Sequence, residues 1–568
     1  MKLARLGVLI DEAAMKRLHS YGLNVFERYI EEILEHAGAP FETITDIRAL
    51  DDRGFDIVIA SVVPENEETA ERLWQYAEHG GTLIAYGGLG LLARRLGCRQ
   101  RPRTGAGYAR LPEFRSVPAP LRCLSAQPWH AEDAGAGAIG ALHASSPQGE
   151  LVGPALQTFA VGRGAIHRWA VDIPTTVVQL QQGTRPVLHD GIPAPDGTAD
   201  IDEGILKADD DIELDWEWDR EKTATGMPYF AYPHADYWRE ALMAHLVRCA
   251  LAKDRTLPLL DYWPEGTGHV ALISFDSDFN EDERAVVTLD VLKKLQIPST
   301  WCMIEPGYSP QVYERVLAEG HELALHYNAL EKENGIWSLE EFTRQRQWVQ
   351  SATGLARVVS NKNHYTRYEG WGELFRWCEA NGIAADQTRG PTKRGNVGFL
   401  FGTCHPYFPI AWCDEGNRRY DVLEIGFLTQ DLNHPNLSDT TVIEPFLKQV
   451  AKVGGVAHFL FHQIHIHRLE PVRQAIREVV GKARQMGFAF WTSKQINDWQ
   501  RARRTMRVTG IDAAGQVRLE RGTVNEPVAV WLPTSEAPES IQSPGIVYRY
   551  GVPCIKQVHH LTREEAEC

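Results

Sequence analysis

The chain has 568 residues, 43% of them hydrophobic and 24% charged, with a formal net charge of −16 at pH 7. At about 150 residues per domain, this length predicts three or four domains with ordinary globular cores. The acidic balance, which no basic stripe interrupts, argues against nucleic acid and anionic membrane as partners.

Targeting signals and cysteine usage indicate the compartment. The apolar run at the start ends at Asp11 and is too short for a signal peptide core. Nowhere does the chain approach the roughly 18–20 apolar residues that a membrane-spanning helix needs. The nine cysteines are scattered and never spaced CxxC, which is typical of reduced thiols. We therefore expect a cytoplasmic enzyme with no membrane partner.

Residues 4–97 alternate strand and helix patterns. We predict strands in RLGVLI, FETIT, FDIVIAS and GTLIAYGG, with helices in NVFERYIEEILEHAG and ENEETAERLWQYAEHGG. This alternation predicts a parallel sheet with helices on its faces. Residues 98–230 are richer in Pro, Gly and Ala and predict an irregular, β-rich elaboration, which a helix over 234–252 closes. The first domain is thus expected to span 1–255.

A second α/β domain is expected over 256–504. From residue 269, strand patterns in VALISFDSD, STWCMIE, HELALHY and GVAHFLFHQIHI alternate with helix patterns such as AVVTLDVLKKLQ. This series of βα units predicts a barrel-like domain whose chemistry lies at the C-terminal ends of its strands. Residues 505–568 alternate with turn signals and predict a small β appendage.

Two aspartates, Asp276 and Asp278, follow the first strand of that domain in ISFDSDFN. Alternation along a strand places both side chains on the same side, a few ångströms apart. Two like charges this close repel unless one is protonated or a cation lies between them. The alternative is a solvated turn in which one aspartate caps the next helix.

Three further motifs accompany these aspartates, namely GHELALHYNAL, VVSNKNHYTRYEGW and HFLFHQIHIHR. With them, the segment 269–500 resembles the polysaccharide deacetylase superfamily. That resemblance implies a distorted (β/α) barrel, a divalent metal ion with zinc as the expected metal, and hydrolysis of an amide bond, usually an N-acetyl group on a sugar. It also implies that Asp276 is the general base and Asp278 a metal ligand, and the charge of a metal keeps both carboxylates ionised.

The motif GHELALHYNAL departs from the family pattern. The resemblance implies that His326 is a metal ligand, but the family's next ligand position falls on Leu330, which cannot bind a metal. His321 faces the opposite side of its strand. Asn328 offers a carbonyl oxygen, which is a weak ligand for zinc.

The motif VVSNKNHYTRYEGW supplies a replacement. We expect His364 to take the place of the missing ligand. We expect Arg367 to pair with Asp276, since the family has an arginine-containing motif here that orients the base. The alternative is a surface hydrogen-bonding pair.

The resemblance assigns further roles along the rest of the segment. It implies that His462 is the general acid, a role that an ordinary pKa near 6.5 suits. Asp386 is expected to hold the catalytic His or Arg, and His405 and Tyr407 in HPYF are expected to line a substrate groove. A helix cap and a loop histidine are the alternatives for these positions. The later histidines of HFLFHQIHIHR are expected at the rim.

The first domain resembles class I glutamine amidotransferase-like domains, which have a flavodoxin-like parallel sheet. In LIAYGGLGLLARRLG, Tyr86 stands at the position of the family's nucleophilic cysteine, and Cys98 lies beyond it. A phenol with a pKa near 10 does not replace a thiolate. We expect this domain to be catalytically silent and to serve substrate recognition or assembly, including a homo-oligomer.

These observations predict a metal-dependent amidohydrolase that deacetylates an N-acetylated sugar or oligosaccharide. The alternative is a non-catalytic carbohydrate-binding or scaffold protein derived from a deacetylase. Leu330 and the silent first domain favour that alternative.

Overall fold

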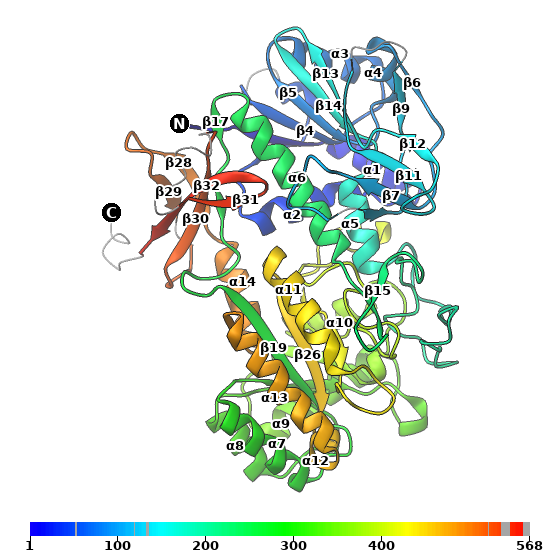
Figure 1. Ribbon diagram of the computed structural model, residues 1–568, viewed down its shortest axis with the longest axis vertical. Coiled ribbons are helices and arrows are strands. Elements are labelled where there is room, and N and C mark those ends of the chain that lie inside the picture. The colour runs from blue at the N-terminus through cyan, green and yellow to red at the C-terminus, as the bar shows by residue number, and fades with distance from the viewer. Residues whose placement is uncertain (51–53, 119, 132–135, 521, 536–545, 561–568) are drawn as a thin grey trace.

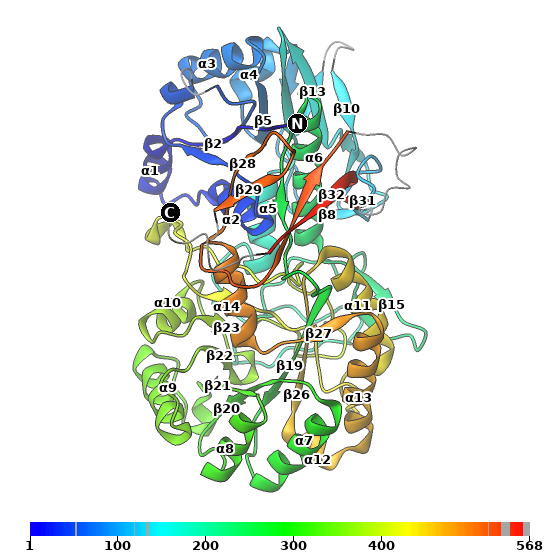
Figure 2. The same cartoon turned by 90° about the vertical axis from the view of Figure 1, so that its left-hand side faces the viewer.

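A computed structural model describes residues 1–50, 54–118, 120–131, 136–520, 522–535 and 546–560. Two α/β bodies lie one above the other along the long axis, and a small β unit lies beside their junction (Figure 1). The view turned by 90° shows the same order, with α14 (Ser493–Arg503) near the junction (Figure 2). None of the described helices is long and apolar enough to cross a membrane.

A seven-stranded sheet forms the first body. Its order is β10 (Gly137–Ile139), β13 (Leu156–Val161), β14 (Gly164–Trp169), β5 (Thr82–Tyr86), β4 (Ile57–Val62), β2 (Leu6–Ile10) and β3 (Glu42–Ile44). The strands from β14 to β3 run parallel, whereas β13 and β10 run antiparallel at one edge. All residues of β2 and β5 are buried, as expected for strands covered on both faces.

Strand β14 lies where the sequence patterns did not place it. We expected GAIHRW to belong to the irregular elaboration, but β14 pairs in parallel with β5 in the middle of the sheet. The hairpin of β13 and β14 turns at Gly162, whose φ of 55° suits a residue without a side chain. The second strand of this hairpin therefore completes the main sheet.

Helices pack on both faces of this sheet, where they close two separate apolar cores. They are α1 (Glu12–Ser20), α2 (Ile30–Ala37), α3 (Glu67–Glu78), α4 (Gly90–Arg95), α5 (Ile173–Gln182) and α6 (His234–Leu251). The elaboration is β-rich, as expected. Its strands are β6 (Cys98–Gln100), β7 (Gly107–Arg110), β8 (Leu121–Cys123), β9 (Trp129–Ala131), β11 (Ala141–Ala144), β12 (Leu151–Gly153), β15 (Arg220–Lys222) and β16 (Pro228–Phe230).

The second body is built on a parallel sheet. Its order is β24 (Leu423–Glu424), β23 (Ala385–Asp386), β22 (Ser360–Asn363), β21 (Glu322–Tyr327), β20 (Thr300–Met303), β19 (His269–Asp276), β26 (Val456–His462) and β25 (Thr429–Gln430), and β27 (Phe488–Phe490) also pairs with β19. All of these pairs are parallel.

This sheet curls but does not close into a full barrel. Strands β24 and β25 are its two ends among the described residues. The chain crosses from one end to the other between Glu424 and Thr429, so the ends lie within about 18 Å of each other. The expected barrel is therefore a strongly curled sheet with one unpaired seam.

Helices of the second body follow its strands. They are α7 (Asp282–Leu295), α8 (Pro310–Ala318), α9 (Leu339–Thr353), α10 (Glu373–Ala380), α11 (Ile443–Val453), α12 (Gln463–Arg468), α13 (Glu470–Gln485) and α14. Local signals set their ends. Ser338 caps the start of α9 and Gly354 ends it in the left-handed conformation, while Thr492 and Gln495 form a capping box on α14.

The C-terminal residues form β strands beside the junction. An antiparallel sheet joins β18 (Leu259–Leu260), β30 (Val528–Pro533), β32 (Val552–His559) and β31 (Ile546–Arg549), and β28 (Arg507–Ile511) pairs with β29 (Val517–Glu520). Strand β18 comes from the link before the second body, and β1 (Lys2–Leu3) pairs with β17 (Arg255–Thr256) nearby. Residues 536–545 and 561–568 of the expected appendage lie outside the described residues.

Candidate metal centre and active site

The side chains expected to carry chemistry gather at one edge of the second sheet. Asp276 ends β19, His326 lies in β21, His462 ends β26, and His364 directly follows β22. Because the strands are parallel, their C-terminal ends meet at the same edge. A cavity of about 260 Å³ opens there, and Asp278 lines it together with Asp276, His364 and His462.

Asp278, His326 and His364 each present one ligand atom to a common point. Nε2 of His326 and Nδ1 of His364 both lie 3.3 Å from Oδ1 of Asp278. The two ring nitrogens lie 3.2 Å from each other. Two ligand atoms that are each about 2.0–2.1 Å from a tetrahedral zinc ion are about 3.3–3.4 Å apart. The spacing of these three atoms therefore fits an ion of this size.

In both His326 and His364, the ring nitrogen that faces away from Asp278 has an acceptor as its partner. Nδ1 of His326 lies 3.0 Å from the carbonyl oxygen of Lys362, so it carries the proton and leaves a lone pair on Nε2. Nε2 of His364 lies 3.2 Å from a carboxylate oxygen of Glu333, so Nδ1 faces the centre and offers a lone pair there when the ring is neutral. Outer acceptors of this kind are typical of metal-binding histidines.

The centre attracts positive charge. Oδ1 of Asp278 is buried and accepts no hydrogen bond from the described residues. Burial raises the pKa of Asp278, but its contacts with His326 and His364 outweigh burial and hold the pKa well below its usual range. Burial lowers the pKa of His364, yet Asp278 and Glu333 raise it to about 9. His364 therefore holds a proton next to Asp278. A divalent cation in that place would compensate the charge of Asp278 more fully.

Lys362 is the cationic partner of Asp276. Its Nζ lies 3.4 Å from Oδ1 of Asp276 and donates to Oγ of Ser274 at 2.8 Å. The side chain is fully buried in β22, next to β21. Sequence reasoning missed this residue, although a lysine inside a buried strand, SNKN, is an unusual feature that points to a partner.

Arg367 does not take that place. The turn over His364–Thr366 holds Tyr365 at a φ of 57° and leads Arg367 away from the strand edge. The guanidinium donates to Glu369 at 2.8 Å and to the carbonyl oxygen of Ala329. The predicted pairing of Arg367 with Asp276 is therefore wrong.

His462 faces the cavity from the end of β26. Its Nδ1 donates to Oδ2 of Asp431 at 2.5 Å, and its Nε2 lies 3.7 Å from Oδ2 of Asp278. His465 contacts the same oxygen of Asp431 at 2.8 Å. Burial lowers the pKa of His462, but Asp431 and two nearby aspartates raise it to about 10. His462 is therefore protonated at neutral pH, as a general acid must be.

Asp386, which was expected to hold the catalytic histidine or arginine, lies elsewhere. It is fully buried and accepts from Nδ2 of Asn361 at 2.7 Å and from the backbone N–H of Thr388 at 2.9 Å. It therefore braces β22 and the loop after β23. Asp431, at the end of β25, holds His462 instead. That strand has two residues, too few for an alternating pattern to reveal it.

His405 and Tyr407 lie in the junction between the two bodies. Nδ1 of His405 lies 3.1 Å from Nε2 of His36, and its Nε2 lies 2.9 Å from the carbonyl oxygen of Val453. The hydroxyl of Tyr407 donates to the carbonyl oxygen of Gln181 at 3.2 Å. Both side chains are buried, so the predicted substrate groove is not at HPYF, which packs the two bodies together.

The first body supplies one wall of the active-site cavity. Asp202 and Lys207, from the long loop between α5 and β15, line it beside Lys393 of the second body. Both ammonium groups contact Oδ2 of Asp202, that of Lys207 at 2.5 Å. The backbone N–H of Ala208 donates to the carbonyl oxygen of Thr366 at 3.1 Å. The loop is thereby fixed against the turn that carries a candidate ligand.

A second group of ligand-type side chains lies inside the first body. Atoms of His167, His245 and Cys249 lie within 4.8 Å of one another. Nε1 of Trp169 donates to Nδ1 of His245 at 3.1 Å, so Nε2 of His245 carries a proton and donates it to Nδ1 of His167 at 2.8 Å. Burial lowers the pKa of His167 to about 4, so this ring is neutral. The chain of donors and acceptors is complete without a metal.

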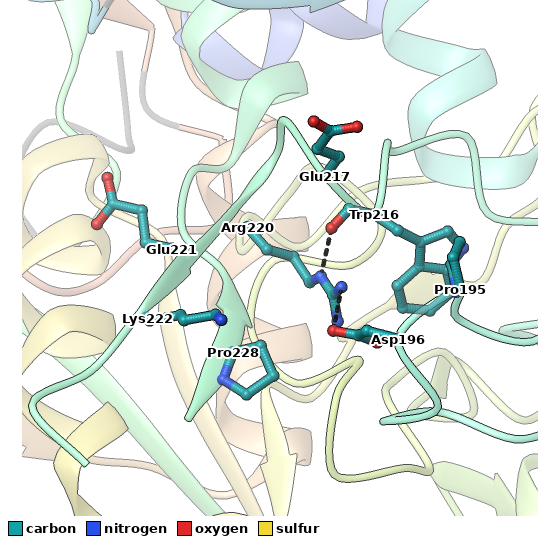
Figure 3. A pocket seen from close by; sticks show the side chains of 8 residues that line it. All are labelled: Pro195, Asp196, Trp216, Glu217, Arg220, Glu221, Lys222 and Pro228. Atoms are coloured by element: carbon teal, nitrogen blue, oxygen red, sulfur yellow. Dashed lines mark hydrogen bonds and ion pairs between the residues drawn. The ribbon is translucent and has the colours of Figure 1, made fainter. Parts of the chain in front are cut away.

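The other features of the first body offer little chemistry. Tyr86 is buried at the end of β5, and burial raises its pKa well above its usual range. A cavity of about 450 Å³ lies at the β15–β16 hairpin (Figure 3). There Arg220 donates to Asp196 at 2.9 Å and to the carbonyl oxygen of Trp216 at 2.7 Å. Its charge is compensated within the fold, and the described lining includes no histidine or cysteine.

Fold and site together define an α/β protein with a candidate metal centre at the C-terminal edge of a parallel sheet. No protein-family model matches the sequence, and no curated protein matches it. Similar solved structures include a protein from Mycobacterium smegmatis provisionally assigned as a polysaccharide deacetylase, with 15% identity and a TM-score of 0.32 over 42% of this chain and 92% of that chain.

Two other similar structures come from different kinds of enzyme. The Xyl-CE4 domain of a multidomain xylanase from the hindgut metagenome of Trinervitermes trinervoides has 12% identity and a TM-score of 0.24, over 40% of this chain and 90% of that chain. A β-galactosidase from Rahnella sp. R3 has 19% identity and a TM-score of 0.24, over 29% of this chain and 28% of that chain. At these TM-scores the similarities identify neither a family nor an activity.

Proposed function

We propose that the chain is a metal-dependent amidohydrolase that deacetylates an N-acetylated sugar or oligosaccharide. One observation carries the proposal. One oxygen of Asp278 and one ring nitrogen each of His326 and His364 lie 3.2–3.3 Å from one another, and outer partners turn both of these nitrogens inward. A cation satisfies such an arrangement, and a set of one carboxylate and two imidazoles suits zinc.

The base of the proposed reaction is Asp276. When bound, a divalent cation supplies Lewis acidity to the acyl oxygen and to an attacking water. Oδ2 of Asp276 lies 3.8 Å from Nε2 of His326, so the carboxylate is next to the ligand set, where it accepts the proton of that water. The ammonium group of Lys362 compensates the charge of Asp276 from the opposite oxygen.

The acid of the proposed reaction is His462. Its bond to Asp431 fixes the ring and leaves the Nε2 proton directed to the cavity. From there the ring protonates the leaving amine nitrogen. Asp431 does not touch the substrate in this scheme and acts by holding the imidazolium in place.

The cavity favours a small reacting group. Its volume of about 260 Å³ is just below the range of about 300–1,000 Å³ that is typical of small-molecule sites. An acetamido group and the sugar ring that carries it match this size. In this proposal the first body, which supplies one wall of the cavity, serves substrate recognition.

A carbohydrate-binding or scaffold protein without catalysis is the alternative. It was favoured by Leu330 at a ligand position and by Tyr86 at a nucleophile position. His364 offers a third ligand atom without Leu330, which weakens the first of these reasons.

Acetate release from N-acetylglucosamine oligosaccharides by the full-length chain tests the proposal. We expect release that a chelator abolishes and added zinc restores. Asp278→Asn, which keeps the shape of the side chain but removes its charge, should be inactive, whereas Cys249→Ala, in the group inside the first body, should retain activity. A native chain that binds zinc but releases no acetate would favour the non-catalytic alternative.

A further inference from the structure

A cavity of about 670 Å³ lies where the three parts of the chain meet. The first body contributes Arg115, from the loop after β7, and Arg248 of α6. The second body contributes Lys452 of α11, and the C-terminal unit contributes Arg549 at the end of β31. Four basic side chains from three regions therefore face one space.

Negative charge in this cavity is scarce. Glu240 of α6 is the one carboxylate among its described lining residues. Burial raises the pKa of Glu240 to about 7, although Arg549 and Lys452 act in the opposite direction. The carboxylate is therefore only partly ionised at neutral pH, and Arg549 alone among the four cations has another carboxylate partner among the described residues, Asp261 at 3.5 Å.

Three of these cations have no carboxylate partner. Among the described residues, no ion pair or hydrogen bond joins Arg115, Arg248 or Lys452 to a carboxylate. Arg248 donates instead to the carbonyl oxygen of Glu113 at 2.7 Å, and Nζ of Lys452 lies 5.1 Å from the ring centre of Tyr237. Burial lowers the pKa of Arg248, the charge of Glu113 acts in the opposite direction, and the charge of Arg115 lowers it further.

The cavity in Figure 3 provides an internal comparison. There the single arginine, Arg220, is paired with Asp196, so the cavity needs no ligand to balance its charge. At the junction cavity, cations repel one another across a partly desolvated space and attract an anion. This contrast occurs in a chain whose overall formal charge is −16, so the cationic cavity is a local feature.

We propose that the junction cavity binds a small molecule that carries a phosphate group. Guanidinium groups bind phosphate oxygens in a two-pronged geometry, and the ammonium group of Lys452 adds a point charge. Tyr237, Tyr548 and Tyr550 line the same cavity and offer aromatic surface to a ring attached to the phosphate. Because the wall comes from three parts of the chain, the bound ligand fastens the β31–β32 hairpin to both bodies. This site is separate from the proposed metal centre and does not depend on it.

Calorimetric titration of the full-length chain at constant ionic strength tests this site. The probes are inorganic pyrophosphate, glucose 6-phosphate and adenosine monophosphate. We expect saturable binding of one equivalent, and at least tenfold weaker binding after Arg115→Ala combined with Lys452→Ala. Lys448→Ala is the matched control, because Lys448 is exposed one turn earlier in α11 and outside the cavity lining. It should change the dissociation constant less than twofold.

Phosphate also binds metal ions, so the titration is repeated with Asp278→Asn. Binding that persists in Asp278→Asn and weakens in the double variant supports the junction site. Binding that is lost in Asp278→Asn but kept in the double variant overturns it, as does the absence of saturable binding of all three probes. If the double variant does not fold, the exposed Arg115→Ala alone decides, with an expected loss of at least threefold. The strongest probe shows whether a free polyphosphate or a phosphate ester is preferred.

Discussion

Two of the histidine groups among the described residues, one in each body, differ in where their protons lie. In the first body, Trp169 donates to His245, and His245 donates to His167, so the inward lone pairs are already satisfied. In the second body, acceptors bind the outer nitrogens of His326 and His364, so both inner nitrogens face the centre and would offer lone pairs to a cation that replaces the proton held on His364. Residue type and spacing do not separate these groups. The hydrogen bonds on the far side of each ring do.

Removal of an inner ligand should have the largest effect. His326→Ala should reduce acetate release by at least about 10³-fold, since metal-ion catalysis contributes several kcal/mol. His167→Ala changes the same residue type in the other group and should leave metal content and turnover per folded molecule unchanged. Equal loss of metal in both variants would break the distinction between the groups.

Changing an outer acceptor should have a smaller effect. Glu333→Gln keeps an acceptor oxygen near Nε2 of His364 but removes the charge. We expect metal affinity to fall about 10–100-fold, as is usual when an outer partner of a metal-bound histidine is changed. Competition with a chromophoric chelator measures this constant. Unchanged affinity would mean that Glu333 does not direct the ring.

The pH dependence of stability tests the ion pair between His462 and Asp431. Its raised pKa of about 10 contributes stability to the chelator-treated chain that is fully present below the unfolded value near 6.5 and lost as pH rises through 10. The pKa of Asp431 is lowered in the folded chain, so its contribution to stability is fully present above its unfolded pKa near 3.9. The cost of Asp431→Asn in urea unfolding should therefore be greatest between about pH 4 and 6.5 and shrink toward pH 10. A cost that grows with alkalinity would contradict the pairing.

The smallest effect on function is expected from removal of the N–H group of Trp169, which donates to the histidine group in the first body. Trp169→Phe removes the N–H that satisfies Nδ1 of His245. We expect a loss of about 1–3 kcal/mol in the free energy of unfolding, from the unpaired acceptor and the smaller ring, without a change in bound metal. Urea denaturation and elemental analysis measure the two quantities. Gain of a second metal ion would show that this group is less completely satisfied than its hydrogen bonds indicate.

Sequence patterns predicted the α/β alternation of both bodies because long amphipathic helices and buried strands have clear periods. The resemblance to polysaccharide deacetylases, rather than a local pattern, led to Asp278, His326 and His364 as joint ligands, and the structure places their ligand atoms within 4.8 Å of one another. The partners of the catalytic groups were not predictable in this way. Lys362 of β22 reaches Asp276 of β19 across the curled sheet, with two strands between them, and no local pattern encodes that contact.

The residues whose roles were predicted wrongly or missed also depend on contacts between distant segments. His405 was expected to line a substrate groove with Tyr407, but packing between the two bodies buries it against His36. Asp431 follows a strand of two residues, which is too short to be recognised without its neighbours. In each case the decisive contact joins segments far apart in the sequence.

The most direct test is the number of zinc ions that bind to the chelator-treated, full-length chain. The proposed centre predicts one ion per chain, the loss of that ion in His364→Ala, and its retention in His167→Ala. A native chain that binds no zinc, or a His364→Ala variant that still binds one ion with unchanged affinity, would contradict the proposed centre.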